Sequence, residues 1–455
     1  MGVFGGEGQF TAGKSFFGMI LLGSGDMKGK HGTALFVFLI LLLGGPAGFA
    51  QKTTPVYEDK VNEENIQSAR LFPNRPDYEA QMMPPIVELN SGVTLRLVFD
   101  DLAYDPDMYS VKIIHCNFDW TPSDLKDPEI LAEYNEFNIQ EYNYSIDTRI
   151  PYIQYHFVLP RVRKSGNYAV LVYRGRDQKQ VVLTKRFMVY QKSVALAAQI
   201  VPPAQTENRR QVQQINVNVN YKNRELFDPK NNLRVLIRQN QRWDNAKVLP
   251  NPTMIREDIK MVEYQLFDGS NTFWAGNEFR FIDLRYVRAR GQNVASVKME
   301  EDVVFAEGGT DRPRMQTAYS EYLDINGQYA IMNLERQNYE RESEYMLVTF
   351  NLSADGVTDV PYLIGSFTKW GKEPTAKMEL NKKTNTYQAT LLLKQGWYDY
   401  QYAYLTKDGF DTGKLEGNYF ETENEYEIFL YFRDMGSRYD ELIGYVNLNP
   451  NKRRL

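Results

Sequence analysis

The stretch that decides the fold class runs from residue 152 to residue 189. It reads YIQYHFVL (152–159), then SGNYAVLVY (165–173), then VVLTKRFMV (181–189). Each run has alternating or short continuous apolar character and is rich in β-branched and aromatic residues, which is typical of strands. The turn at 165–167 leads directly into the middle run, as in the late hairpin of an immunoglobulin-like sandwich. We therefore predict an all-β protein.

The same pattern recurs along the rest of the chain and predicts three tandem immunoglobulin-like or early-set β-sandwiches. The first, 55–192, adds strands at 94–99 and 109–116 and a helical or loop insertion at 125–142. The second, 193–336, has strands at 215–221, 233–238, 263–267 and 278–287 and a loop at 307–313. The third, early-set-like, spans 344–432, with strands at 345–352, 362–370, 387–394, 397–404 and 426–432. We expect a linker at 337–343 and a polar C-terminal tail at 433–455.

Composition supports this organisation. The chain has 455 residues, 43% of them hydrophobic and 24% charged, which fits about three domains with proper cores and excludes disorder of the whole chain. Tyr (31) and Phe (25) are abundant, and aromatic residues favour strands. The net charge of −5 is small for this length, so we expect no nucleic-acid partner.

The N-terminal region predicts export. Basic residues at 28 and 30 precede an apolar run at 34–43, and small residues follow it up to Ala50. This order predicts a signal peptide at 27–50, cleaved between Ala50 and Gln51. The apolar run is too short to cross a bilayer core of about 30 Å, so we expect no transmembrane segment in the mature chain. Residues 1–26 precede a complete signal peptide, which suggests that the true start is Met27 instead of Met1.

Few residues are available for catalysis. Cys116 is the only cysteine, so no disulfide forms within the chain, and only His115 and His156 remain after the predicted cleavage. Adjacent residues of a strand point to opposite faces, so we expect that His115 and Cys116 do not form a catalytic pair. The acidic turn with Asp100, Asp101, Asp105 and Asp107 could bind calcium, but Asp is common in turns and the spacing is not that of an EF-hand. We expect no cofactor, no metal and no enzymatic activity.

Two tryptophans leave a second function open. Trp370 and Trp397 lie in the third block, whose pattern is similar to that of glycogen-binding modules with exposed indole rings that stack on sugars. The alternative is that both rings belong to the core, because one face of every strand must supply core residues. A carbohydrate-binding protein of the cell envelope is therefore the second hypothesis.

Several segments carry a resemblance to a known family. They are YEDKV (57–61), IIHCNFDWTPSDL (113–125), KSGNY (164–168), RFMV (186–189), QNQRWDNA (239–246), GNEFR (276–280), GNYFETENEY (417–426) and GSRYDELIG (436–444). With these segments the chain resembles the type IX secretion system plug proteins of Bacteroidota. None of the segments is a catalytic motif.

The resemblance implies a non-enzymatic, periplasmic subunit that closes the inner mouth of a giant outer-membrane β-barrel translocon when no cargo occupies it. It implies association with the inner face of the outer membrane. The family supplies no binding motif that can be mapped onto this sequence. The aromatic insertion at 122–142 suggests Tyr134, Phe137 and Tyr142 as partner contacts, and the alternative is that it covers the first sandwich itself.

Overall fold

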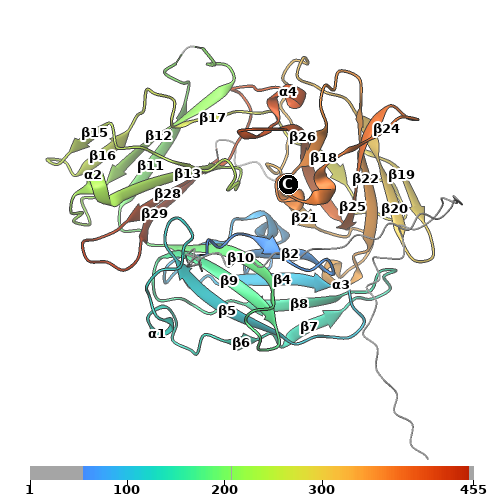
Figure 1. Ribbon diagram of the computed structural model, residues 1–455, viewed down its shortest axis with the longest axis horizontal. Coiled ribbons are helices and arrows are strands. Elements are labelled where there is room, and N and C mark those ends of the chain that lie inside the picture. Colours follow the sequence, from blue (N-terminus) through green and yellow to red (C-terminus); the bar gives the residue numbers. More distant parts are fainter. Residues whose placement is uncertain (1–54, 206, 450–455) are drawn as a thin grey trace, which may run out of the picture. The chain divides into compact units, whose positions relative to one another are not determined.

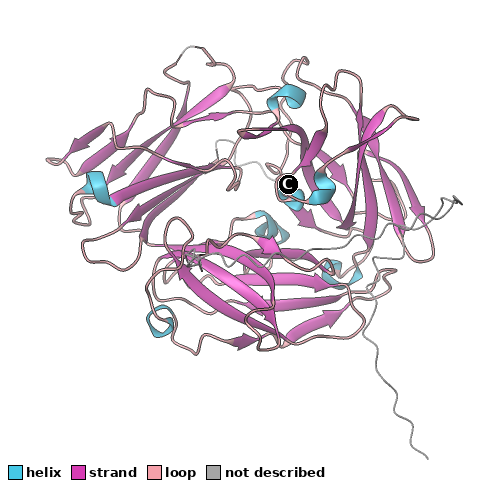
Figure 2. Ribbon diagram, viewed as in Figure 1, coloured by secondary structure: helices cyan, strands magenta, loops and turns pink. Residues whose placement is uncertain are grey.

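The computed structural model describes residues 55–205 and 207–449, and this part of the chain is nearly all β (Figures 1 and 2). The predicted all-β class is confirmed: antiparallel pairings dominate, and the sheets pack in pairs around separate apolar cores. The predicted signal peptide at 27–50, its cleavage site at Ala50 and Gln51, and the segment 1–26 lie outside the described residues. No helix in the described ranges is long and apolar enough to span a bilayer.

The first sandwich contains residues 60–190. One sheet has the order β1-β10-β9-β5-β6, with β3 parallel to β10, and the other has the order β2-β4-β8-β7. The strands of the first sheet are β1 (Lys60–Val61), β3 (Ile86–Glu88), β5 (Tyr109–Cys116), β6 (Phe137–Asn138), β9 (Gly166–Arg174) and β10 (Val181–Tyr190). Those of the second are β2 (Ile66–Pro73), β4 (Leu95–Asp101), β7 (Glu141–Tyr144) and β8 (Ile153–Val158), and the short helical turns are η2 (Tyr78–Met82) and α1 (Asp127–Ile130).

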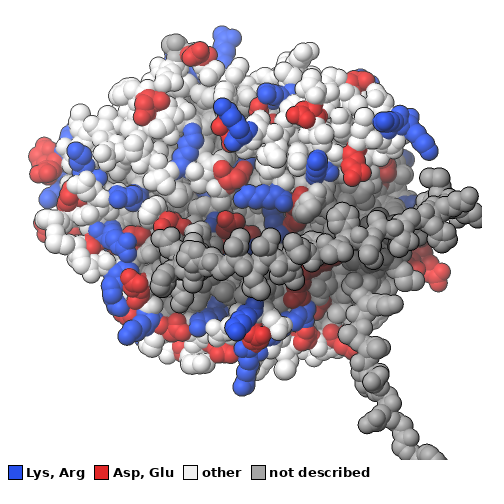
Figure 3. Space-filling view, viewed as in Figure 1, with Lys and Arg blue, Asp and Glu red and all other residues white. Residues whose placement is uncertain are grey.

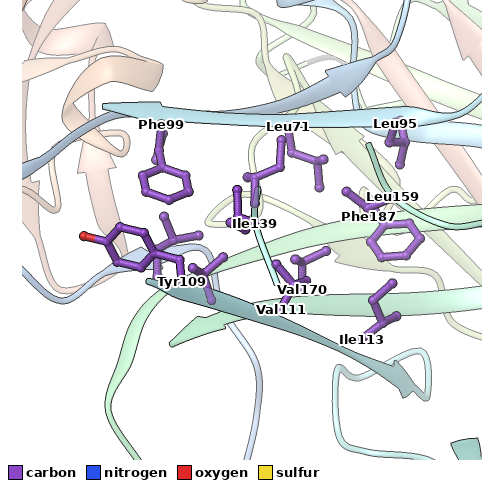
Figure 4. Close-up of a cluster of buried hydrophobic side chains, with 14 of the residues drawn as sticks. Leu71, Leu95, Phe99, Tyr109, Val111, Ile113, Ile139, Leu159, Val170 and Phe187 are labelled. Atoms are coloured by element: carbon purple, nitrogen blue, oxygen red, sulfur yellow. The ribbon is translucent and has the colours of Figure 1, made fainter. Parts of the chain in front are cut away.

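The core of the first sandwich follows the period of two that the sequence predicted. Leu95 and Phe99 of β4 face Val111 and Ile113 of β5 across the space between the sheets (Figure 4). Ile139, which follows β6, fills the same space, so the insertion after β5 contributes to this core. Alternation along each strand thus places one face of both sheets in a common apolar layer.

The middle sandwich is built from two separate stretches of the chain. One sheet has the order β11-β12-β16-β15 with β17 beside β12, and the other has the order β14-β13-β28-β29. The strands of the first sheet are β11 (Ala195–Val201), β12 (Val212–Asn220), β15 (Met254–Arg256), β16 (Met261–Tyr264) and β17 (Thr272–Trp274). Those of the second are β13 (Leu233–Gln239), β14 (Lys247–Val248), β28 (Tyr426–Phe432) and β29 (Glu441–Leu448), and α2 (Pro229–Asn232) precedes β13.

The third sandwich is inserted between β17 and β28 of the middle one. Its first sheet consists of β18 (Arg280–Asp283), β21 (Tyr329–Ile331), β23 (Pro361–Ile364) and β27 (Gly409–Asp411), all paired with the long strand β26 (Gly396–Thr406). Its second sheet has the order β19-β20-β22-β25-β24. These strands are β19 (Val294–Met299), β20 (Val304–Asp311), β22 (Tyr345–Ser353), β24 (Glu379–Asn381) and β25 (Thr386–Lys394). The helical turns are α3 (Tyr339–Glu342), η3 (Ser366–Thr368), η4 (Pro374–Ala376) and α4 (Gly413–Glu416).

Strand pairing crosses the domain boundaries expected from the sequence. The segment 426–432, expected to close the third sandwich, forms β28 and pairs along its length with β13 of the middle one. The segment 278–287, expected in the second block, contributes β18 to the third sandwich, where it pairs with β26. Both segments have the strand pattern that was predicted, but an apolar pattern specifies a strand without specifying its partner.

Two local expectations were wrong. Residues 307–311, expected in a loop, belong to β20, which runs parallel to β22 and has a register shift between Glu307 and Thr310. A Cβ at Gly308 would lie 3.1 Å from the carbonyl oxygen of Thr349, so the glycine that suggested a loop permits close approach within a bulged strand. The tail expected to be polar contains β29, whose Leu442 and Ile443 are fully buried.

Candidate functional site

Several of the segments that carry the family resemblance, among them 113–125, 239–246 and 436–444, meet where the first and middle sandwiches touch, here called the first junction. His115, at the end of β5, lies at its edge. Its Nδ1 is 2.8 Å from the hydroxyl of Ser123, and its Nε2 is 3.1 Å from the carbonyl oxygen of Ser165. Because a carbonyl can only accept, Nε2 carries the proton and Nδ1 accepts from Ser123 in a neutral imidazole. Burial lowers the pKa of His115 to about 4, so the ring stays neutral near pH 7.

The turn after β8 requires a glycine at position 166. Its φ is +139°, and a Cβ at this position would lie 2.5 Å from Nε2 of His115. Any other residue would push the imidazole away from the Ser165 carbonyl and add backbone strain. The turn and the histidine therefore depend on each other.

Hydrogen bonds tie the next residues of the turn across the first junction. Asn167 donates to the carbonyl oxygens of Asn117 (3.1 Å) and Phe118 (3.3 Å), and its own Oδ1 accepts from the hydroxyl of Tyr431 at 2.8 Å. From the other side, the carboxylate of Asp440 accepts the backbone N–H of Phe118 at 3.1 Å. Tyr431 and Asp440 belong to the middle sandwich or its connection, so these bonds fix one sandwich on the other.

A stack of cations and aromatic rings crosses the same junction. The guanidinium carbon of Arg186 lies 4.3 Å from the ring centre of Trp120 and 5.2 Å from that of Trp243. The guanidinium carbon of Arg238 lies 4.4 Å from the ring centre of Trp243, and its nitrogens donate to both carboxylate oxygens of Glu427 at 2.6 and 2.9 Å. Each cation–π contact contributes about 0.5–2 kcal/mol when desolvated. The segments 118–122 and 242–246 therefore contribute Trp120 and Trp243 to one stack.

Cys116 also lies at the first junction, where its side chain is fully buried. The prediction that His115 and Cys116 point to opposite faces is confirmed: His115 packs edge-on against Tyr168 of the first core, whereas Cys116 belongs to an apolar cluster with Met188, Leu236 and Phe429. Burial raises the pKa of the thiol to about 12, so it remains protonated at neutral pH.

The acidic turn after β4 is occupied by protein partners. Asp101 accepts hydrogen bonds from Asn65 (2.6 Å) and Tyr109 (2.7 Å), and Asp107 pairs with Arg174. Among residues 55–205 and 207–449, no group of three or more His, Cys, Asp or Glu side chains could hold a metal ion. An opening of about 200 Å³ at one end of the first sandwich is lined by residues 87–95 and 159–162 together with Phe187 and Val189.

The two tryptophans considered for sugar binding pack against other side chains, with Trp397 buried and Trp370 partly buried. Trp397 is 7% exposed, stacks on Phe281 at 4.2 Å between ring centres and lies under the guanidinium of Arg285 at 5.0 Å. Trp370 packs edge-on against Phe279 and lies under Arg242 at 4.9 Å. Sugar stacking requires an open ring face, and both rings have close protein neighbours instead.

Comparison with known proteins connects these features to a family. A family model described as "Type 9 secretion system plug protein 1st domain" matches residues 66–191, which are the first sandwich. Residues 66–191 of this chain are thus similar to the first domain of type 9 secretion system plug proteins. A search of curated proteins gave no match. Among solved structures, a hypothetical protein from Parabacteroides merdae ATCC 43184 is similar with a TM-score of 0.80 and 29% identity, covering 87% of this chain and 99% of that one.

Within the first sandwich, the three residues suggested as partner contacts have different environments. Tyr134 is 81% exposed and Tyr142 is 41% exposed, so both rings are accessible. Phe137, in β6, is half-buried, packs against the first core and lies 5.8 Å from Phe157 between ring centres. The insertion also places Ile130, Leu131 and Ile139 in that core, so it covers the first sandwich as well as presenting aromatic side chains.

The first sandwich also has exposed apolar side chains that the sequence did not identify as candidate contacts. Tyr104 and Met108 are exposed in the turn after β4, and Tyr144 is exposed on β7. The rings of Tyr142 and Tyr144 are 6.0 Å apart, which the period of two along β7 would have indicated had that short strand been recognised. The sequence alone does not distinguish such residues from core aromatics in neighbouring strands.

Proposed function

We propose that this chain is a non-enzymatic periplasmic subunit of the type 9 secretion system that closes the periplasmic mouth of the outer-membrane β-barrel translocon when no cargo occupies it. The observation that carries the proposal is the match of the whole first sandwich to the first domain of a plug protein. A pore wide enough for folded cargo would leak periplasmic contents, so a soluble stopper has a physical role there.

The architecture suits a protein that acts by filling space. Three sandwiches, two of them joined through a buried junction of rings and cations, form stiff blocks whose loops can dock on a rim. On the face shown in Figure 3, basic and acidic side chains are interspersed, without an extended patch of one sign. Such a mixed surface favours a reversible, moderately polar contact over binding to a polyanion.

The experiment that tests the proposal is affinity purification of the tagged full chain from native membranes, followed by identification of co-eluting proteins. We expect the large barrel subunit to co-elute in the absence of cargo. Recovery of the chain without any outer-membrane barrel would contradict the proposal.

Tyr134 and Tyr142 are the proposed contact residues in the first sandwich, whereas the half-buried Phe137 packs against its core. We expect the double variant Tyr134→Ser/Tyr142→Ser to lower recovery of the barrel without changing the melting temperature, because both rings are exposed. Phe267→Ser is the matched control, since this ring is exposed on the middle sandwich. Equal recovery of the barrel with the double variant and the control would remove these two residues from the contact.

A further inference from the structure

The first sandwich has a second neighbour, the third sandwich, and the two junctions differ in chemistry. The first junction contains eight buried apolar residues, among them Cys116, Trp120 and Phe429. The junction with the third sandwich, here called the second junction, has a smaller apolar cluster of four buried residues, with Met82 on one side and Ile325, Ala330 and Trp397 on the other. Most of its remaining contacts are polar.

The centre of the second junction is a fully buried ion pair. Nζ of Lys394, at the end of β25, lies 2.6 Å from the carboxylate of Asp100, at the end of β4, and both side chains are 0% exposed. Asp100 also accepts hydrogen bonds from the hydroxyl of Tyr345 (2.7 Å) and from Gln154 (2.9 Å). Lys394 lies 3.8 Å above the ring of Tyr152. Each charge therefore has partners from both sandwiches.

The rest of the second junction consists mainly of hydrogen bonds and partly exposed ion pairs, such as that of Arg96 with Glu340 at 2.9 Å. The N–H of Ile146 donates to the carbonyl oxygen of Arg341 (2.8 Å), and the N–H of Arg149 donates to the carboxylate of Glu344 (2.9 Å). The N–H of Ile331 donates to Oε1 of Gln81 at 3.0 Å. Water can replace each of these bonds at little net cost once the surfaces part.

We propose that the first and third sandwiches separate along the second junction while the first junction stays closed, and that the buried pair of Asp100 and Lys394 is the latch that holds the second junction shut. The third sandwich then pivots on its two connections to the middle one, near Asn277 and Glu423. This inference stands apart from the proposed function, because it concerns only contacts within the chain.

The reasoning rests on how apolar and ionic contacts respond to water. Opening the first junction would expose a continuous apolar cluster, and no solvent contact replaces that burial. Opening the second junction returns two charges to water, which recovers the hydration that was lost when the pair was buried. The pair is strong only while both partners are present, because either charge alone would be buried without compensation.

Amide hydrogen exchange resolved to single residues tests the proposal on the full chain. The amides of Ile146, Arg149 and Ile331 report on the second junction, because each donates across it. The amides of Phe118 and Gln191 report on the first junction, because they donate to Asp440 and Leu442. In the wild type we expect the second-junction amides to exchange faster than the first-junction amides. Slower or equal exchange at the second junction would overturn the proposal without any variant.

The variant Lys394→Met leaves Asp100 without its cation. We expect second-junction amides to exchange faster by a factor on the order of 100 or more, which corresponds to the loss of one partner of a buried pair, while first-junction amides keep their rates. Acceleration of both sets by the same factor, or of neither, would refute the latch. Arg256→Met is the matched control, because its pair with Glu263 is partly exposed in the middle sandwich.

A second variant keeps the test decisive if Lys394→Met does not fold. In Asp100→Leu/Lys394→Met both charges are replaced by apolar side chains of similar size, which at buried pairs is often neutral or stabilising. We expect second-junction amides to be protected at least as well as in the wild type. Faster exchange at the second junction in this double variant than in the wild type would show that the recovered hydration of the two charges does not favour opening, and this would overturn the proposal.

Discussion

Acidification should destabilise the first sandwich through His115. The folded chain holds this imidazole neutral, with a pKa lowered to about 4 chiefly by burial, whereas the unfolded chain has the ordinary value of 6.5. Between these two values the unfolded state binds more protons, so the free energy of unfolding falls as the pH falls. At about 1.4 kcal/mol per pH unit, the contribution lost between pH 6.5 and pH 4 is about 3 kcal/mol.

The variant His115→Gln isolates this contribution. A glutamine can still donate to the Ser165 carbonyl and accept from Ser123, but it does not titrate. We expect the difference in unfolding free energy between wild type and variant, from urea unfolding at a series of pH values, to shrink by about 3 kcal/mol between pH 7 and pH 4. An NMR titration of the ring should give a pKa near 4. A difference that stays constant with pH, or a ring that titrates near 6.5, would refute the reasoning.

Three further predictions concern the first junction. Gly166→Ala should lower the free energy of unfolding by about 2–4 kcal/mol because its Cβ would collide with the imidazole, whereas Gly175→Ala, with open space around it, should cost about 1 kcal/mol in urea unfolding. Arg238→Met should lower the free energy of unfolding by about 3–5 kcal/mol, because it leaves the buried carboxylate of Glu427 without its cation. Arg256→Met, at a partly exposed pair, should lower it by less than about 1 kcal/mol. The thiol of Cys116 should not react with a disulfide reagent in the folded chain at pH 8, and should react fully in denaturant.

The strands could be predicted from the sequence because the apolar pattern that specifies a strand lies within the strand segment itself. The run at 109–116 forms β5 with the same ends, and alternation correctly placed His115 and Cys116 on opposite faces. The run at 426–432 was also recognised, but it is buried on both faces and has no alternation that would indicate which sheet it joins. Its partner β13 lies almost 200 residues earlier, at 233–239, and the insertion of a whole sandwich between them has no local signature.

The resemblance could be recognised from segments such as 113–125 and 436–444, and the structure explains what those segments have in common. They are the parts that lock the first sandwich onto the middle one, through the Phe118–Asp440 bond and the stack around Trp243. These segments require particular residues because many of their side chains are buried against, or hydrogen-bonded to, specific partners on another segment. A partner contact that must be reversible has no such requirement, so exposed rings such as Tyr134 can bind without a recognisable motif. The sequence therefore reveals how this chain is assembled more directly than it reveals the surface that a partner would bind.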